Sequence, residues 1–290
     1  MKRVLVTGAS GFIGRAVLPF LADCDDYDVH AISRTPVEGV RWHRGDLLAG
    51  DAERLIASLR PTHLLHLAWY GAADYWTSPR NGKWLDASRR IVDAFVTHGG
   101  ERAVFAGTCA EYDWSDGVCS EETTAIAPAS IYGLSKDALR RAVEAAPISS
   151  AWGRIFFVYG PGELPTRLVP SLIRPLLAGG RAECRHPSLR RDFLHVDDVA
   201  RAFAMLLDSD ARGAVNIGSG EAMPLGELAQ RIARLTGGRV VPGDAPAAMA
   251  PLVVADVARL RALGVSAEVS LDRGLRETIA WWRERARISA

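Results

Sequence analysis

A glycine-rich turn near the start of the chain is the feature that most limits how this sequence can fold. Thr7-Gly8-Ala9-Ser10-Gly11-Phe12-Ile13-Gly14 follows an apolar, β-branched run and precedes a segment with helical spacing of apolar residues. The first two glycines let the chain turn tightly beside a pyrophosphate, and the third lets helix and strand pack closely. The helix N-terminus presents free N–H groups to the phosphates. The alternative is a strand-to-helix turn without a ligand, but the context favours a dinucleotide site formed by Gly8, Ser10, Gly11, Phe12, Ile13 and Gly14.

Strand-like and helix-like segments alternate through the first half of the chain. Apolar, β-branched runs predict strands over residues 3–7, 28–33, 63–68, 102–108 and 151–158. Helical spacing of apolar residues predicts helices over residues 12–22, 51–59, 83–97 and 132–145. Alternation of this kind is typical of a parallel sheet covered by helices on both faces.

The pattern changes after Tyr159. Helices are expected over residues 168–177, 225–235 and 271–282, with a further helix that is capped by Asp197 and Asp198 and runs to residue 207. Short strands are expected over 193–196 and 215–217, and a Pro- and Ala-rich loop over 242–251. The predicted fold class is therefore α/β. Residues 1–160 form a Rossmann-type doubly wound parallel sheet, to which 190–220 contribute, and 161–290 form mainly a smaller C-terminal α/β lobe that binds substrate.

Composition excludes several classes of partner. The 35 basic and 34 acidic side chains leave a net charge of +1, so no strong field attracts nucleic acid or an anionic membrane. The four cysteines lack metal-ligand spacing, so neither a metal site nor a disulfide framework is expected. No apolar run reaches the ~18 residues typical of a membrane span. Because the first residues lead directly into the glycine motif, we expect no signal peptide and a cytoplasmic protein.

The end of the second predicted strand bears on the choice of cofactor. An acidic residue there accepts hydrogen bonds from the ribose 2′-hydroxyl of NAD. This chain has Ser33 and Arg34 instead. A guanidinium pairs with a 2′-phosphate, although Arg34 could also be simply solvated. We expect both residues to contact the cofactor and NADP(H) to be preferred, with NAD as the alternative.

A tyrosine and a lysine four residues apart suggest redox chemistry. Tyr132 and Lys136 share one face of the helix predicted over 132–145. A phenol is a weak acid at neutral pH, and a neighbouring ammonium favours its phenolate. Such a tyrosine can protonate a carbonyl oxygen while a hydride reaches the carbon, or act in the reverse direction. The alternative is an i,i+4 pair on an exposed helix.

Together, the glycine motif, the Tyr132-x-x-x-Lys136 pair and the order of strands resemble the extended branch of the short-chain dehydrogenase/reductases. This branch includes sugar-nucleotide epimerases, dehydratases and reductases. The resemblance implies that Thr108, 24 residues before Tyr132, completes the catalytic group and that Lys136 also holds the nicotinamide ribose. It further implies a homodimer formed through the helices over 83–97 and 132–145. Cofactor contacts are implied for Asp46, Leu47, Leu67, Ala68, Trp69 and Phe156, although Asp46 could equally cap the next helix.

The residues after Thr108 bear on the reaction. In 4,6-dehydratases of this branch the catalytic threonine is followed by Asp-Glu, whereas this chain has Cys109 and Ala110, so dehydration is not expected. Phe157 replaces an asparagine that contacts the substrate diphosphate in epimerases. Arg191 lies in an Arg-Asp-Phe-x-His-Val-x-Asp element and is the implied diphosphate ligand. Tyr70 and Cys109 are further expected substrate contacts, while Asp192, His195 and Asp198 are expected to be structural.

These observations favour an NADPH-dependent reductase that converts a nucleotide-linked 4-keto-6-deoxysugar to the alcohol. A sugar-nucleotide 4-epimerase is the alternative, because the same group can oxidise and re-reduce one carbon. A third hypothesis, a non-catalytic NADP(H) sensor, is disfavoured because the chain keeps both Tyr132 and Lys136. At least one aromatic side chain is expected to touch the substrate, from the set Trp69, Tyr70, Tyr75, Trp76 and Trp114.

Overall fold

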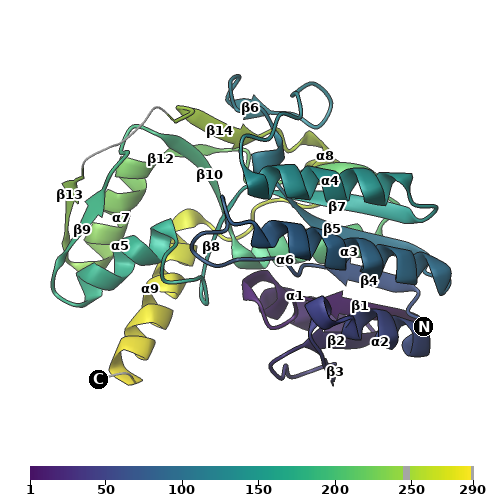
Figure 1. The fold of residues 1–290 in the computed structure, drawn as a ribbon. Helices are drawn as coiled ribbons and strands as arrows, with labels where there is room; N and C mark the ends of the chain where they lie inside the picture. Colours follow the sequence, from purple (N-terminus) through teal and green to yellow (C-terminus); the bar gives the residue numbers. More distant parts are fainter. Residues whose placement is uncertain (244–248, 289–290) are drawn as a thin grey trace.

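The first 159 residues alternate between strands and helices, as the sequence predicts (Figure 1). The computed structural model describes residues 1–243 and 249–288, so part of the predicted loop over 242–251 lies outside the described residues. The strands in this half are β1 (Lys2–Thr7), β2 (Tyr27–Ser33), β3 (Arg41–Arg44), β4 (His63–His66), β5 (Arg102–Thr108), β6 (Val118–Cys119), β7 (Ser149–Ile155) and β8 (Phe157–Tyr159). The helices are α1 (Phe12–Ala22), α2 (Asp51–Leu59), α3 (Arg80–Thr97) and α4 (Ile131–Ala145), with 3₁₀ turns η1 (Leu47–Ala49) and η2 (Cys109–Glu111).

The remaining residues add shorter elements. The strands are β9 (Arg181–Cys184), β10 (Arg190–His195), β11 (Gly213–Ile217), β12 (Ala222–Pro224), β13 (Arg239–Pro242) and β14 (Leu252–Ala255). The helices are α5 (Leu168–Leu177), α6 (Val196–Asp208), α7 (Leu225–Thr236), α8 (Ala258–Ala262) and α9 (Leu271–Ile288). Figure 1 shows α9 at the opposite side of the molecule from the N-terminus.

Seven parallel strands form the main sheet, in the order β11-β7-β5-β4-β1-β2-β3. Helices α1 and α6 pack together on one face, where Val17, Leu21 and Phe203 are fully buried. Helices α2, α3 and α4 cover the other face, where Ile91 and Phe95 are fully buried. The predicted α/β fold of Rossmann type is thus confirmed, and its order of strands brings β1, β4 and β5 side by side.

A second group of strands and helices lies beside one end of the main sheet (Figure 1). Its strands follow the order β12-β10-β14-β6, with β8 paired to β10, and β9 pairs with β13. Helices α5, α7 and α9 share a separate apolar core that includes Ile173, Leu228 and Leu275. The chain passes between this group and the main sheet several times, because β6 and β8 belong to the second group although they come early in the sequence.

Two local predictions are wrong. Residues 151–158 do not form one strand: β7 ends at Ile155 in the main sheet, and β8 begins at Phe157 in the second group. At the break, the backbone N–H of Phe156 donates to the carbonyl of Ile217 at 3.0 Å, so a neighbouring strand sets the change of direction. The cap of α6 is His195 rather than Asp197 or Asp198, because the His195 ring nitrogen Nδ1 accepts the N–H of Asp197 at 3.3 Å.

No helix among residues 1–243 and 249–288 combines the length and the apolar character needed to cross a lipid bilayer. The carboxyl ends of β1, β4 and β5 all meet at one edge of the main sheet, since the strands are parallel. Open α/β sheets bind ligands at this edge, so the segments that follow these strands are the first place to look for a site.

Candidate active site

The glycine motif forms a tight turn in which backbone packs on backbone. Gly8 has φ +73°, and a Cβ atom there would lie 2.6 Å from the backbone nitrogen of Ala68. A Cβ on Gly14 would lie 2.1 Å from the carbonyl oxygen of Gly8. Gly11 caps α1 without any side-chain hydrogen bond to the first N–H groups of the helix. The turn therefore needs glycine at these positions and leaves the helix N-terminus open to an anion, as a dinucleotide pyrophosphate requires.

The segment after β4 lies directly against this turn. The N–H of Leu67 donates to the carbonyl of Thr7 at 3.2 Å, and the N–H of Ala68 reaches the Thr7 hydroxyl at 3.4 Å. The indole N–H of Trp69 donates to Asn81 at 2.8 Å. Leu67 and Ala68 are thus brought together with the glycine motif, and Trp69 directly follows them.

Two guanidinium groups lie at the adjoining ends of β2 and β3. Ser33 and Arg44 are register partners at the ends of β2 and β3, and Arg34 follows Ser33. The Ser33 hydroxyl is already engaged, because it donates to the carbonyl of Thr35 and accepts the indole N–H of Trp42. Arg34 and Arg44 are both exposed, and no carboxylate within residues 1–243 and 249–288 pairs with either. Arg44 was not predicted from the sequence, because only the strand register reveals its position.

Asp46 lies nearby and has a structural role of its own. Its carboxylate accepts the N–H of Leu48 at 3.0 Å and caps the turn η1. Its backbone N–H donates to Asp51 at 2.7 Å. The next residue, Leu47, is buried in the apolar core under α2 and α3. Asp46 therefore caps the turn η1, and this hydrogen bond uses one of its two carboxylate oxygens.

Thr108 and Tyr132 face each other at the end of β5. Thr108 is almost fully buried, and its hydroxyl accepts the N–H of Ala110 at 3.2 Å. Tyr132 lies in the first turn of α4, which Ser130 caps by accepting the N–H of Gly133. Burial, and then Tyr75, raise the pKa of Tyr132 above its ordinary value, while a hydrogen bond with Thr108 favours the phenolate. The phenol therefore carries its proton at neutral pH.

Lys136 projects from α4 into a buried site. Its ammonium donates to the carbonyl of Ala106 at 2.8 Å and lies 3.9 Å from the centre of the Trp69 ring. Burial lowers its pKa to about 7, and the carboxylate of Glu111 acts in the opposite direction. The amine thus titrates within the physiological range.

Aromatic side chains cover Tyr132. The Tyr75 and Trp76 rings pack edge-on against it, with ring centres 4.9 Å and 5.9 Å from the phenol ring. Trp114 packs edge-on against Trp76, and the Arg167 guanidinium lies 4.0 Å from the centre of the Tyr75 ring. Two segments distant in sequence, the loop before α3 and the loop before α5, therefore meet over the phenol.

A cavity of about 430 Å³ opens beside this aromatic cluster. Trp76, Trp114 and Tyr112 form apolar walls, and Asp113 and Ser130 supply polar groups. Its volume lies within the usual range for small-molecule sites, roughly 300–1,000 Å³. Trp76 and Trp114, two of the five aromatic residues predicted to approach a ligand, thus line a hollow next to the catalytic candidates.

Of the other predicted substrate contacts, Cys109 and Arg191 lie near each other, whereas Tyr70 lies in a different loop. Tyr70 donates to Asp74 at 2.6 Å in the loop after β4. Cys109 and Arg191 are both buried and close enough for the guanidinium to affect the thiol, whose pKa burial raises well above its ordinary value. One terminal nitrogen of Arg191 is buried without a hydrogen-bond partner among the described residues. Arg191 lies over the ring of Phe157, and Phe156 is buried in the core on the α1 and α6 face.

Asp192 and Asp198 accept backbone N–H groups from segments distant in the sequence, and His195 caps α6. Asp192 is fully buried and accepts hydrogen bonds from the N–H groups of Ser219, Gly220 and Ala255. Asp198 accepts the N–H groups of Glu268 and Val269 and pairs with Arg201 at 2.8 Å. These contacts accord with the structural roles expected for all three residues.

A buried carboxyl group in the loop after β8 was not predicted from the sequence. Glu163 is 7% exposed, and its Oε2 atom has no hydrogen-bond partner among the described residues. Burial raises its pKa to about 8, and Arg167 opposes this shift. A Cβ on the preceding Gly162 would touch the Phe12 ring, so the loop reaches the glycine motif. A largely neutral carboxyl group therefore lies between the cofactor turn and the aromatic cluster.

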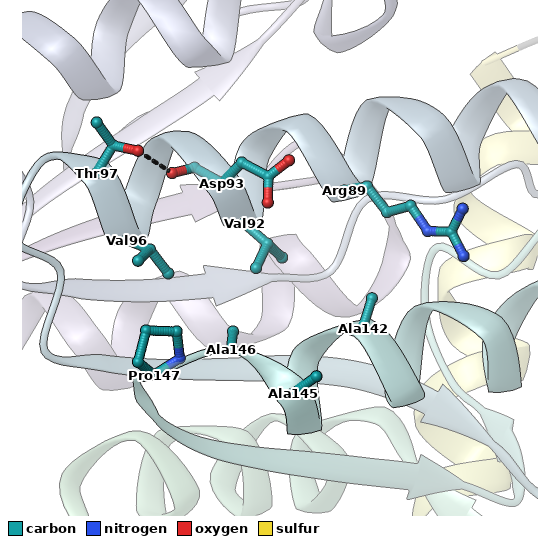
Figure 2. A pocket seen from close by; sticks show the side chains of 9 residues that line it. All are labelled: Arg89, Val92, Asp93, Val96, Thr97, Ala142, Ala145, Ala146 and Pro147. Carbon is teal, nitrogen blue, oxygen red and sulfur yellow. Dashed lines mark hydrogen bonds between the residues drawn. The ribbon is translucent and has the colours of Figure 1, made fainter.

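A second hollow lies between α3 and α4, away from these residues (Figure 2). Its volume is about 340 Å³, and Figure 2 shows Val92 and Val96 facing Ala142, Ala145 and Ala146 across it. Arg89 and Asp93 supply the charged groups of its lining. The groove contains none of the predicted catalytic or cofactor residues.

Comparison with known proteins places this geometry in a family. A sequence profile described as the NAD dependent epimerase/dehydratase family matches residues 4–218, which is most of the chain. The chain belongs to the NAD dependent epimerase/dehydratase family. The resemblance to extended short-chain dehydrogenase/reductases is thereby confirmed, and relatives in the family include sugar-nucleotide dehydratases and epimerases.

Individual members of the epimerase/dehydratase family differ in activity. The solved structure of MoeE5 in complex with UDP-glucose and NAD is 33% identical, with a TM-score of 0.86, covering 98% of this chain and 99% of that one. The 2'-dehydrokanamycin reductase of Streptomyces kanamyceticus is 31% identical over 84% of this chain and 70% of its own. The dTDP-D-glucose 4,6-dehydratase of Mus musculus is 25% identical over 98% and 89%.

Substitution of Gly14 by alanine tests the backbone packing of the cofactor turn. The new Cβ would lie 2.1 Å from the Gly8 carbonyl, so we expect Gly14→Ala to lower the free energy of unfolding by about 2 kcal/mol and to weaken dinucleotide binding. Chemical denaturation and fluorescence titration measure the two effects. Gly82→Ala in α3 is the matched control, because nothing lies within 4 Å of its Cβ and the change should be neutral or stabilising. Equal stability of the two variants would contradict the prediction.

Proposed function

We propose that this protein is an NADPH-dependent reductase of a nucleotide-linked 4-keto-6-deoxysugar. In this reaction the ketone, NADPH and a proton give the secondary alcohol and NADP⁺. When bound, NADPH supplies the hydride that reaches the carbonyl carbon. The observation that carries the proposal is the pair of exposed guanidinium groups, Arg34 and Arg44, at the adjoining ends of β2 and β3. Such a pair suits a 2′-phosphate and therefore the cofactor of net reduction.

The residues after Thr108 also support reduction over elimination. A 4,6-dehydratase needs groups that remove and return protons. Ala110 has no titratable group, and burial raises the pKa of the Cys109 thiol well above its ordinary value. The relative named 2'-dehydrokanamycin reductase is consistent with a reductive member at this level of similarity.

The catalytic roles follow from the site at the end of β5. Tyr132 carries its proton at neutral pH and donates it to the carbonyl oxygen of the substrate. Thr108 donates a hydrogen bond to the same oxygen. The ammonium of Lys136 stabilises the phenolate that remains and binds the nicotinamide ribose. At neutral pH the phenol holds the proton that ketone reduction requires, and the hydrogen bond with Thr108 and the Lys136 ammonium would favour its release by stabilising the phenolate.

The residues around the glycine turn would hold the cofactor. The pyrophosphate would be contacted by the residues of the turn, Gly8, Ser10, Gly11, Phe12, Ile13 and Gly14. The adenosine and ribose would be contacted by Leu67, Ala68 and Trp69, and the adenine side by Asp46, Leu47 and Ser33. Phe156 would contact the cofactor near β7. The turn suits this role because its backbone cannot accept a Cβ and the first N–H groups of α1 have no side-chain cap. The substrate contacts are Tyr70, Cys109 and Arg191, with Arg191 on the diphosphate. We assign residues 1–160 and 190–220 mainly to the cofactor, and 161–290 otherwise to the substrate.

A sugar-nucleotide 4-epimerase is the second candidate. It is favoured by solved structures of relatives that contain NAD, including MoeE5 and the UDP-glucose 4-epimerase of Thermus thermophilus, which is 26% identical. An epimerase is redox-neutral and retains its cofactor through the cycle. Purified protein would then carry NAD and turn over without added NADPH. A non-catalytic sensor is the third candidate, and it would retain its output when Tyr132 is changed.

A cofactor-oxidation assay with NADPH and a panel of keto-sugar nucleotides tests the proposed function. We expect turnover of at least one panel member, and a loss of about 100-fold or more in kcat for Tyr132→Phe, because the proton donor is removed. Fluorescence titration should show NADPH affinity within about twofold of the parent, since the phenol oxygen contributes to chemistry more than to binding. Tyr27→Phe, at the amino end of β2 and away from the proposed site, is the control. Turnover without NADPH, together with retained NAD, would favour the epimerase.

Removal of the Arg34 guanidinium tests cofactor preference. Arg34→Ala should raise the KM for NADPH by about 10-fold or more and leave the KM for NADH nearly unchanged, because a charge-assisted contact to the 2′-phosphate is lost. Initial-rate measurements with both cofactors give the ratio. Arg185→Ala, an exposed arginine after β9, serves as the control. Equal changes for both cofactors would argue against a phosphate contact at this position.

We further propose that the protein is a homodimer formed through α3 and α4. The small and apolar residues that line the groove in Figure 2, and the exposed Ile131 and Leu134 on α4, give these helices a face suited to a second copy. Light scattering should give twice the 31.4 kDa mass of one chain. Ala142→Glu should give the mass of one chain, because a carboxylate is costly in such a face. Ala57→Glu on the exposed side of α2 should not change the mass, and a monomeric parent would refute the proposal.

A further inference from the structure

A buried carboxylate lies directly behind Thr108 and was not predicted from the sequence. Glu111 is fully buried at the end of the turn η2. Its Oε2 atom accepts the Nε–H of Arg154 at 2.8 Å, and both of its oxygens accept the indole N–H of Trp152, at 2.9 and 3.0 Å. Arg154 also donates to the hydroxyl of Tyr112 at 2.8 Å. The ion pair with Arg154 and the indole hydrogen bonds compensate the burial of this carboxylate.

The other side of the same carboxylate is joined to Thr108. The backbone N–H of Thr108 donates to Glu111 Oε1 at 2.9 Å, and the Thr108 hydroxyl accepts the N–H of Ala110 at 3.2 Å. These reciprocal bonds form a capping box at the point where β5 ends. The backbone of Thr108, and with it the direction of its hydroxyl, is therefore fixed through Glu111.

The carboxylate also acts on the buried amine of Lys136. The ammonium donates to Ala106, two residues before Thr108 on the same strand, so both groups lie at the end of β5. Burial disfavours the ammonium, and Glu111 is the charged group that favours it. His66, which Lys136 also affects, is neutral, because burial lowers its pKa to about 3 and its two ring nitrogens bond Thr7 and Ser88. Arg154 binds Oε2 of Glu111, whereas Oε1 of Glu111 accepts the backbone N–H of Thr108 at the end of β5.

We propose that Glu111 is a positioning residue of the catalytic site, which fixes Thr108 and is the counter-charge of the Lys136 ammonium. It touches neither substrate nor cofactor and acts through these two residues. The proposal rests on the roles proposed above for Thr108 and Lys136, but its electrostatic part concerns the protein alone. Glu111 lies three residues after Thr108. It is the only carboxylate in the turn η2, because the other two residues of the turn are Cys109 and Ala110.

Nuclear magnetic resonance of lysine carbons tests the electrostatic part directly. The chain has three lysines, Lys2, Lys83 and Lys136, so protein labelled with ¹³C at lysine Cε gives few signals and two surface references. In the parent, the Lys136 signal should titrate with a midpoint near pH 7. In Glu111→Gln, which keeps the shape and removes the charge, the midpoint should fall by about one pH unit. An unchanged or raised midpoint would overturn the proposal.

Two further variants separate this effect from a loss of stability. Glu111→Gln leaves the Arg154 charge buried and unpaired, so Glu111→Gln with Arg154→Met removes both charges and should fold if the single variant does not. Its Lys136 midpoint should also fall. Trp152→Phe is the control, because it removes the indole hydrogen bonds to the carboxylate and some buried ring volume but no charge, and it should leave the midpoint within about 0.2 pH unit of the parent.

Kinetics then test the positioning part in the intact enzyme. Turnover that needs the ammonium is lost as pH rises through the pKa of Lys136, so a lower pKa moves the alkaline limb of the kcat profile to lower pH. Glu111→Gln should show this movement and a fall in kcat of about 10-fold or more at neutral pH, with the KM for NADPH unchanged. Glu111→Asp, which keeps the charge, should restore the position of the limb. Loss of activity without movement of the limb would leave only a structural role and overturn the proposal.

Discussion

Contact of backbone with backbone at the turn between β1 and α1 is the constraint on which the rest of the site depends. Gly8 approaches Ala68 and Gly14 approaches Gly8 more closely than any side chain would allow. These contacts fix the start of α1 against β1 and the segment after β4. Leu67, Ala68 and Trp69 are thereby held beside the turn, and the Trp69 ring in turn packs on the Lys136 ammonium. The proposed cofactor region and the proposed catalytic region therefore share one continuous set of contacts.

Burial shifts the pKa values of the catalytic candidates Lys136 and Tyr132, and neighbouring polar groups oppose these shifts. Burial lowers the pKa of Lys136 to about 7 and raises the pKa of Tyr132, so both shifts favour the neutral forms. Each shift is opposed by a hydrogen bond or charge from the end of β5, Glu111 for the amine and Thr108 for the phenol. Because the interior has a low dielectric constant, such groups have larger effects than they would in water. The strand β5 and the turn η2 thus set the electrostatics of the site as well as its shape.

The main sheet and the glycine turn could be predicted from the sequence because their signals are local. A glycine motif between an apolar strand and a helix, and alternating periodicity after it, need no knowledge of distant contacts. Short strands such as β9, β13 and β14 were not predicted, since each exists only through a partner remote in the chain; β13 pairs with β9, for example. The strand β3 was not predicted because its sequence, Arg41–Arg44, lacks the apolar run typical of a strand. The division of 151–158 into β7 and β8 depends likewise on Ile217, which the local sequence does not reveal.

The candidate site shows the same limit. Thr108, Tyr132 and Lys136 could be found from spacing and resemblance, but Arg44, Glu111 and Arg167 reach their places through strand register and tertiary packing. The sequence predicts the cap that Asp46 makes on η1 as an alternative role, because this contact is local. For α6 the sequence predicts Asp197 and Asp198 as caps, whereas the structure has His195.

The repeated passage of the chain between the main sheet and the second group of strands has a consequence for folding. β6 and β8 leave the main sheet to pair in the second group, while α6 and β11 return to it. Neither unit is a continuous stretch of sequence, so neither can complete its hydrophobic core before the other has begun to assemble. Loss of order in one unit therefore also frees the chain segments that connect the elements of the other, which couples the stabilities of the two units.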